Sequence, residues 1–198
     1  MRHMAARGPY AKGIAKRDEI LDVALDLFAR KGYDRTSVRE IARLTDLSQA
    51  GLLHHFVSKE ELFAEVLRRR DIRNEQSFDE NRGHPVTADG LVAIVRHNSQ
   101  EPGLVRLFVS MAAESTDSES PARSFFEERY RRLRDDLASN VRTRQTSGEI
   151  ASDLDAEAVA ALLIAAADGL QIQWLLDPDG VDMGDRLDQL WSIIRRVQ

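Results

Sequence analysis

Apolar residues recur along most of this chain at helical spacing, and strict alternation of apolar and polar residues is rare. This pattern predicts an all-α protein. The first helix is expected over about residues 14–31, where Ile20, Ala24, Leu27 and Phe28 fall on one face and so should point inward.

A short second helix is expected to begin after Ser37. Glu40 follows three residues later, which is the spacing of a capping box. The helix should end near Leu44, because Thr45 and Asp46 favour local side-chain-to-backbone bonds over helix continuation. Its apolar face consists of Val38, Ile41 and Ala42.

A third helix is expected behind Ser48, the next residue suited to cap a helix. Leu52 and Phe56, four residues apart, can bury one side of it. The opposite side carries Gln49, Ala50, Gly51, Leu53 and His54. Small side chains there would let the backbone approach base edges, and Gln49 can donate and accept hydrogen bonds toward an adenine.

A longer fourth helix should begin behind Ser58, which forms a second capping box with Glu61. Lys59 lies in its first turn, where an acidic residue would suit the helix dipole better, so we interpret this cation as a phosphate contact. A plain helical hairpin with capped ends is the alternative. The short third helix argues against it, because so short a helix is marginal unless it is packed and presented to a partner. The apolar stripe of the fourth helix is Leu62, Phe63, Val66 and Leu67.

The rest of the chain should form a larger helical unit beyond a boundary at residues 82–85. Ser120 and Pro121 suit the start of one helix, and residues 177–180 read as a turn. The stretch over residues 156–176 is the most apolar of the chain, so it must be covered on more than one side, either as a monomer core or in a dimer. Helices are expected near 87–100, 102–115, 121–146, 155–176 and 184–197.

Three segments occur in the order I-L-D-V-A-L-D-L-F-A-R-K-G-Y, T-S-V-R-E-I-A and L-S-Q-A-G-L-L-H-H-F-V-S-K-E-E-L. In order, spacing and residue type they resemble the DNA-binding domain of TetR-family transcriptional regulators, over residues 14–67. The resemblance implies that the Ser48 helix enters the major groove, that the Ser37 helix supports it, and that the Ser58 helix leads to a ligand-binding domain. It implies phosphate contacts from Thr36, Ser37, Ser48, His55 and Lys59. It implies base-edge or groove contacts from Arg39, Gln49, Ala50, Gly51 and His54.

Two residues depart from the family pattern. Asp46 stands where the turn usually has glycine, and aspartate tolerates the left-handed backbone that such a turn needs. Leu53 replaces a tyrosine that often touches phosphate, which puts one backbone contact in doubt. A weaker resemblance over residues 168–178, D-G-L-Q-I-Q-W-L-L-D-P, implies that the last two helices of two subunits pair in a four-helix dimer bundle.

Charge is distributed unevenly along the chain. Residues 1–70 hold 14 Lys+Arg against 10 Asp+Glu, a net of +4, whereas residues 71–198 hold 14 against 23, a net of -9. DNA attraction should therefore be confined to one end. We expect a flexible basic arm over residues 1–13, followed by a helix-turn-helix domain over 14–57, a linking helix over 58–82, and a ligand-binding and dimerisation domain over 83–198. The cations assigned to the arm and its junction are Arg2, Arg7, Lys12, Lys16 and Arg17.

Further composition limits the function classes. The chain has no cysteine, so disulfides and thiolate metal sites are excluded, and we expect a cytoplasmic protein without a membrane partner. No apolar run approaches the roughly 20 residues that span a bilayer. We find no phosphate-binding glycine loop, zinc-protease motif or nucleophile elbow, so we expect neither an enzyme nor a cofactor.

An unidentified small-molecule effector is expected to bind among the body helices, in a site of apolar groups with a few polar ones. Each proposed member has a plainer reading: the Phe and Met residues as core, Glu114 and Arg129 as a mutual or solvated pair, and His97 as a satisfied histidine. The proposed members are His97, Phe108, Met111, Glu114, Phe125, Phe126, Arg129, Gln171 and Trp174.

The sequence thus predicts a homodimeric, ligand-responsive transcriptional regulator that binds a palindromic double-stranded DNA operator through two heads, and it favours a repressor. Two alternatives stay open. One is a sequence-indifferent or architectural DNA-binding protein, and the other is an all-α interaction module that only retains the head fold.

Overall fold

The computed structural model describes residues 9–31, 35–56, 58–78 and 85–196. The described part is built of nine α-helices and contains no strand, as the spacing of apolar residues predicts. The helices are α1 (Pro9–Lys31), α2 (Val38–Leu44), α3 (Gln49–Leu53), α4 (Lys59–Phe78), α5 (Ala88–Asn98), α6 (Pro102–Glu114), α7 (Arg123–Thr146), α8 (Ala156–Leu176) and α9 (Met183–Arg196).

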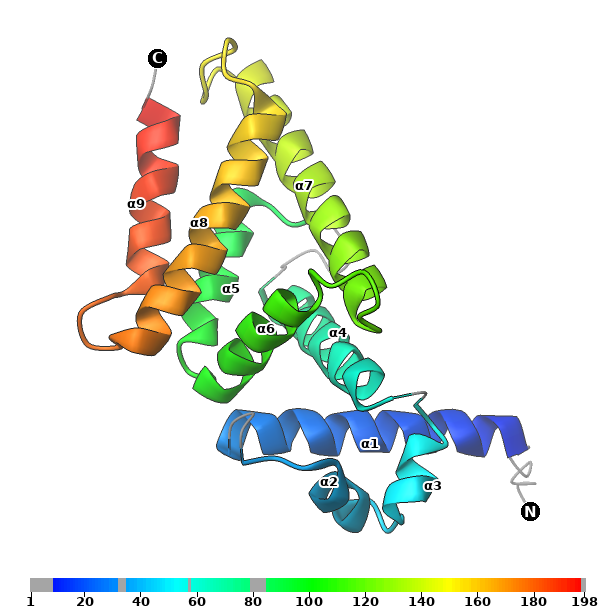
Figure 1. The fold of residues 1–198 in the computed structure, drawn as a ribbon. Coiled ribbons are helices and arrows are strands. Elements are labelled where there is room, and N and C mark those ends of the chain that lie inside the picture. The colour runs from blue at the N-terminus through cyan, green and yellow to red at the C-terminus, as the bar shows by residue number, and fades with distance from the viewer. Residues whose placement is uncertain (1–8, 32–34, 57, 79–84, 197–198) are drawn as a thin grey trace, which may run out of the picture.

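Helices α1, α2 and α3 form a small head at one end of the molecule, and α4 leads from it to the other helices (Figure 1). The turn between α2 and α3 depends on Asp46, whose φ of 53° lies in the left-handed region. Aspartate adopts this region more readily than most residues, as expected from its place in the turn. The chain then returns to bond Leu47 N to the Ala42 carbonyl at 2.8 Å. We refer to α1–α3 as the head and to α5–α9 as the body.

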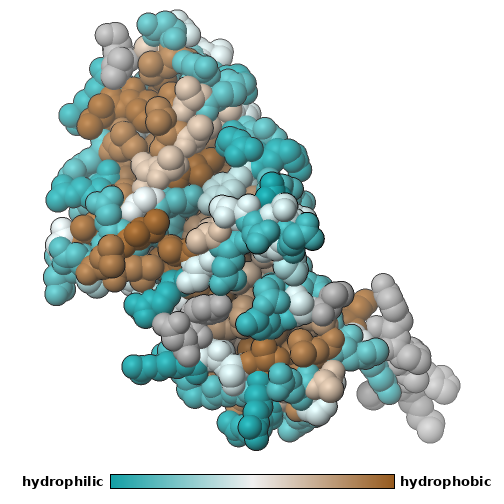
Figure 2. Space-filling model, in the orientation of Figure 1, coloured by the Kyte–Doolittle hydropathy of each residue, from teal (hydrophilic) through white to brown (hydrophobic). Residues whose placement is uncertain are grey.

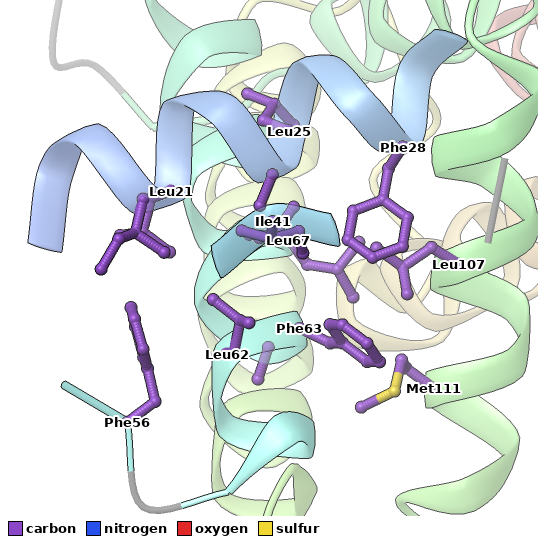
Figure 3. Packing of buried hydrophobic residues seen from close by; sticks show 14 of the residues in the cluster. Leu21, Leu25, Phe28, Ile41, Phe56, Leu62, Phe63, Leu67, Leu107 and Met111 are labelled. Atoms are coloured by element: carbon purple, nitrogen blue, oxygen red, sulfur yellow. The ribbon is translucent and has the colours of Figure 1, made fainter. Parts of the chain in front are cut away.

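The core of the head continues into the body without a break. Phe28 of α1 and Phe63 of α4 meet edge to face with their ring centroids 5.2 Å apart. Leu107 and Met111 of α6 belong to the same buried cluster (Figure 3). Because these side chains are close-packed, a displacement of α4 or α6 must be felt by α1.

A second buried cluster holds the body together around α8, which packs against α6, α7 and α9. Trp191 of α9 is fully buried in this cluster, and its Nε1 donates to Asp89 Oδ1 of α5 at 3.0 Å. The indole therefore has the polar partner that a buried tryptophan requires.

Two expected boundaries are wrong. Helix α1 begins at Pro9, so residues 9–13 belong to a helix, not to a flexible arm. Proline suits such a start because its fixed φ is already helical. Helix α7 begins at Arg123 with Ala122 as its N-cap, two residues after the expected first position at Pro121. Ser120 instead begins a turn, its carbonyl accepting from Arg123 N at 3.0 Å.

The expectation about apolar length also needs correction. Helix α8 has 21 residues and a mean hydropathy of 1.6 in its most apolar window, which would suffice to cross a membrane by length and composition alone. Its inward face is buried against the other body helices, and its Val159, Leu163 and Trp174 belong to the body core. We therefore read α8 as a core helix with one uncovered apolar face.

Candidate nucleic-acid interface

Helix α3 is fixed to the head by its cap and by two buried side chains. Ser48 has an extended backbone, and its Oγ accepts from Gly51 N at 3.0 Å, which satisfies a free N–H at the helix start. Leu52 is 0 % and Phe56 is 1 % exposed. These contacts hold a helix of five residues that would not be stable alone.

The outer flank of α3 is open to solvent. Gln49, Ala50 and His54 are exposed, and Gly51 is partly exposed. A Cβ at Gly51 would lie 3.2 Å from Ser48 Oγ, so glycine keeps the cap uncrowded while it lets the backbone approach a partner closely. Leu53 differs from the prediction: it is half-buried and packs against the head core, so it does not belong to the open flank.

An open groove runs between α2 and α3. Arg39 and Arg43 are both exposed, and neither forms an ion pair within the described part of the chain. Arg43 was missed by the sequence argument, although its position four residues after Arg39 places both on one side of α2. The groove thus combines the polar start of α3 with two unneutralised cations. It is lined by Ser37, Arg39, Glu40, Arg43, Leu47, Ser48 and Gln49.

The other expected phosphate contacts differ in accessibility. Lys59 is 61 % exposed, and among the described residues its one ion pair is with Glu60 at 3.6 Å. Ser37 is exposed and caps α2, accepting from Glu40 N at 3.1 Å. His55 is half-buried, and Thr36 is 9 % exposed, so Thr36 is the least accessible member of the set.

Arg17 has a structural role within the head. Its guanidinium lies 4.2 Å from the centre of the Phe56 ring, donates to the His55 carbonyl, and forms an ion pair with Glu61 at 3.3 Å. It therefore joins α1 to the end of the α3 segment and to α4, and it is not the free arm cation that we expected. Lys16 likewise pairs with Glu19 at 3.0 Å, whereas Arg2 and Arg7 lie outside the described residues.

The residues expected to bind an effector do not share one cavity. Phe108, Met111, Phe125 and Phe126 are 0–5 % exposed and belong to the core cluster around α4 and α6, which is the plainer reading of that pattern. The helical spacing of these four residues therefore indicates that they pack in the core, and it does not indicate a ligand site.

The remaining polar members also lie apart. Glu114 is exposed and is not paired with Arg129, whose partner is Asp71. His97 is half-buried, Trp174 belongs to the body core, and Gln171 is 5 % exposed with its Oε1 lacking a hydrogen-bond partner in the described structure. Arg129 alone of the nine expected residues lines the pocket between α4, α5 and α7.

This pocket has charged residues on one side and apolar residues on the other. Arg129 Nε lies 2.7 Å from Asp71 Oδ2, and Arg70 lies 3.4 Å from Asp71 Oδ1. Burial alone would raise the pKa of Asp71, but the charges of Arg129 and Arg70 outweigh burial and lower this pKa. Asp71 and Arg129 are 58 positions apart in the sequence, which is why sequence spacing did not pair them. The lining is Asp71, Val86, Leu91, Ile94, Arg129, Arg132 and Leu133.

A second polar pair lies next to this ion pair. The Tyr130 hydroxyl donates to Asp168 Oδ2 at 2.7 Å, and Gln171 Nε2 lies 3.5 Å from Asp168 Oδ1. Burial raises the pKa of the Asp168 carboxyl despite the opposing hydrogen bond from Tyr130. Burial and the nearby Asp168 likewise raise the pKa of Tyr130.

A capped, exposed short helix on a three-helix head, beside a cationic groove, defines a helix-turn-helix DNA-binding protein. Two family descriptions match the chain: bacterial regulatory proteins of the tetR family over residues 20–66, and the C-terminal domain of BetI-type transcriptional repressors over residues 86–196. The second match covers more than half of the chain. The chain therefore belongs to the TetR family of bacterial transcriptional regulators.

Named relatives agree with this assignment. The chain is 45% identical over 51 residues to the regulator QacR of Staphylococcus aureus, covering 26% of this chain and 27% of QacR. It is 33% identical over 91 residues to the repressor AcnR of Corynebacterium efficiens, covering 46% of this chain and 44% of AcnR. These matches thus span less than half the length of either relative. The match to the regulator UidR of Escherichia coli is longer, with 26% identity over 149 residues, 75% of this chain and 76% of UidR.

Solved structures with the same fold match nearly the whole chain. Salmonella enterica GusR superimposes with a TM-score of 0.66 at 25% identity, over 96% of this chain and 98% of GusR. A transcriptional regulator of Saccharomonospora viridis in complex with choline superimposes with a TM-score of 0.69 at 30% identity, over 93% of this chain and 97% of that protein.

Proposed function

We propose that the chain is a homodimeric repressor that binds a palindromic DNA operator and is released from it by a small molecule in the body. The observation that carries this proposal is the exposed flank of α3, with Gln49, Ala50 and His54 open to solvent beside the unneutralised cations of α2. Phosphate contacts would supply most of the affinity, and groups at base edges would supply the choice of sequence. Such a function places the protein in the cytoplasm and requires no catalytic residue.

The uncovered face of α8 and α9 supports the homodimer. Leu162 is 63 %, Leu176 is 82 % and Ile193 is 60 % exposed, although all three are large and apolar. Apolar side chains gather over this part of the visible surface, at the end of the molecule away from the head (Figures 1 and 2). Apolar surface gathered on one face of a protein commonly marks an interface. A second copy that covers this face would give the dimer two heads, as binding to a palindrome requires.

Helix α4 provides the connection between the effector pocket and the head. Asp71 lines the pocket, and two residues earlier Arg69 forms a two-point ion pair with Asp22 of α1, with both distances at 2.9 Å. An effector that binds the DNA-incompetent state more tightly would shift the population toward heads at the wrong separation. An effector with equal affinity for both states would shift nothing.

Selection of duplex sequences from a random pool tests the function. We expect the purified chain to enrich a palindrome and to bind it at least about 10³-fold more tightly than random duplex at one salt concentration. The variant Gln49→Ala should lose affinity for the selected sequence while its weak binding to random duplex is unchanged. Equal affinity for selected and random duplex would instead support a sequence-indifferent architectural protein. Absence of DNA binding would support an interaction module.

A further inference from the structure

The guanidinium of Arg129 has unused donors beside the body pocket. Its Nε is bonded to Asp71 Oδ2 at 2.7 Å, and its plane lies over the Phe108 ring with the guanidinium carbon 4.8 Å from the ring centre. In the described part of the structure, Nη1 and Nη2 have no hydrogen-bond partner, and neither is a buried unpartnered atom. Both terminal nitrogens are therefore unpartnered in that part of the structure, on a side chain that is 16 % exposed and held in place by Asp71 and Phe108.

Asp71 cannot offer a comparable free charge. Each of its two oxygens faces an arginine, with Oδ2 2.7 Å from Arg129 and Oδ1 3.4 Å from Arg70. Arg70 and Arg129 together carry two positive charges against the single negative charge of Asp71, so this group suits an anion better than a cation.

The opposite wall of the pocket is apolar. It is formed by Val86, Leu91, Ile94 and Leu133. The cavity volume is about 40 Å³, well below that of sites that bury a drug-sized ligand. A pocket of this size and polarity can enclose one small anionic group, with a short apolar body lying along its open apolar wall.

We propose that the effector of this protein is a small amphipathic carboxylate whose two oxygens are bound by Nη1 and Nη2 of Arg129, with its apolar part against Val86, Leu91, Ile94 and Leu133. Arginine is the residue best shaped for this contact, since its parallel N–H groups match the two oxygens of a carboxylate. The inference rests on the proposed function and names the chemical class of the inducer.

The same arginine provides a route by which the anion could act on the head. A carboxylate on Arg129 competes with Asp71 for the guanidinium charge, and Asp71 belongs to α4. Arg69 on the same helix is bonded to Asp18 and Asp22 of α1. Weakening the contact between α4 and α7 would therefore let α4 move together with the head.

The test compares three probes of equal chain length: hexanoate, hexan-1-ol and hexyltrimethylammonium. Isothermal titration calorimetry of the full chain without DNA gives the affinity for each. We expect hexanoate to bind about 10- to 100-fold more tightly than the other two, as for a hydrogen-bonded charge pair. Arg129→Gln should remove this advantage and leave binding of hexan-1-ol unchanged. The matched control is Arg131→Gln on the same helix, because Arg131 is 65 % exposed and pairs only with Asp135 in the described structure.

Several results would overturn the inference. They are no measurable binding of hexanoate, equal or tighter binding of the alcohol or the ammonium compound, and hexanoate affinity that is unaffected by Arg129→Gln. If thermal unfolding shows that Arg129→Gln does not fold, the inference is tested by comparing the three probes on the unmodified chain and by measuring hexanoate binding to Arg129→Lys. Lysine keeps the positive charge but lacks the parallel N–H groups of the guanidinium, so hexanoate should bind this variant more weakly than it binds the unmodified chain. Because no DNA is present, a failure here leaves the operator-binding proposal standing, and it is distinguishable from a failure to select a palindrome.

Discussion

Neutralising Lys59 should change how strongly salt weakens DNA binding. Lys59 is 61 % exposed, and its described ion pair, 3.6 Å from Glu60, is long, so most of its charge is available to a phosphate. Each phosphate neutralised by a cation contributes about -0.9 to the slope of log K against log salt. A dimer contains two copies of Lys59, so Lys59→Ala should make the slope less steep by about 1.8.

This difference is large enough to measure by fluorescence anisotropy with a labelled duplex. Between about 50 and 200 mM salt, the unmodified chain should lose roughly tenfold more affinity than Lys59→Ala loses. The loss should be the same for selected and random duplex, because phosphate contacts carry no sequence information. Arg134→Ala, which removes an exposed cation of α7, is the control and should leave the slope unchanged. An unchanged slope in Lys59→Ala would refute the assignment of Lys59 as a phosphate contact.

Three further predictions concern stability, assembly and pH. Leu52 is 0 % exposed, so Leu52→Ala should lower the free energy of unfolding by about 2–5 kcal/mol in urea titrations and should weaken operator binding. An unchanged midpoint of urea unfolding would contradict the packing of α3. Leu162→Glu should convert the dimer to a folded monomer, as measured by light scattering, because it places a charge on an apolar position that is 63 % exposed. If the variant remains a dimer, the interface lies elsewhere. The folded pKa of Asp71 is below its ordinary value of 3.8, so its ionised form contributes stability above that pH and loses it as the pH falls through the folded value. Asp71→Asn should therefore be less stable than the unmodified chain near neutral pH and converge with it in acid, as judged by thermal unfolding at a series of pH values, whereas a constant difference would argue against this linkage.

The head could be predicted from the sequence because its signals are local. Ser37, Ser48 and Ser58 each accept from the backbone N–H three residues later, at 3.0–3.1 Å, as the cap positions indicate. Apolar spacing likewise identified Leu52 and Phe56 as anchors. Leu53 shows the limit of this reasoning, since it lies only about 100° around the helix from the buried Leu52 and so falls at the border between the buried and open sides.

The pocket could not be predicted because its contacts are distant in the sequence. The ion pair between Asp71 and Arg129 joins α4 to α7, and no local pattern relates two residues that far apart. Aromatic residues at helical spacing, such as Phe108 and Phe125, were chosen as ligand contacts but lie in the core. A helical pattern identifies which side of a helix is buried, and it does not distinguish a packed core from the wall of a cavity.

The central claim is that the exposed flank of α3 enters DNA grooves at two sites. Because the chain contains no cysteine, Ala50→Cys provides a single thiol on that flank for attachment of an iron–EDTA group that cleaves nearby DNA. We predict two patches of cleavage on the selected duplex, centred about 34–36 Å apart along the helix axis. The same group at Thr143→Cys, an exposed position in the body, should give background cleavage only. Background cleavage from Ala50→Cys on a duplex that the protein still binds would contradict the account.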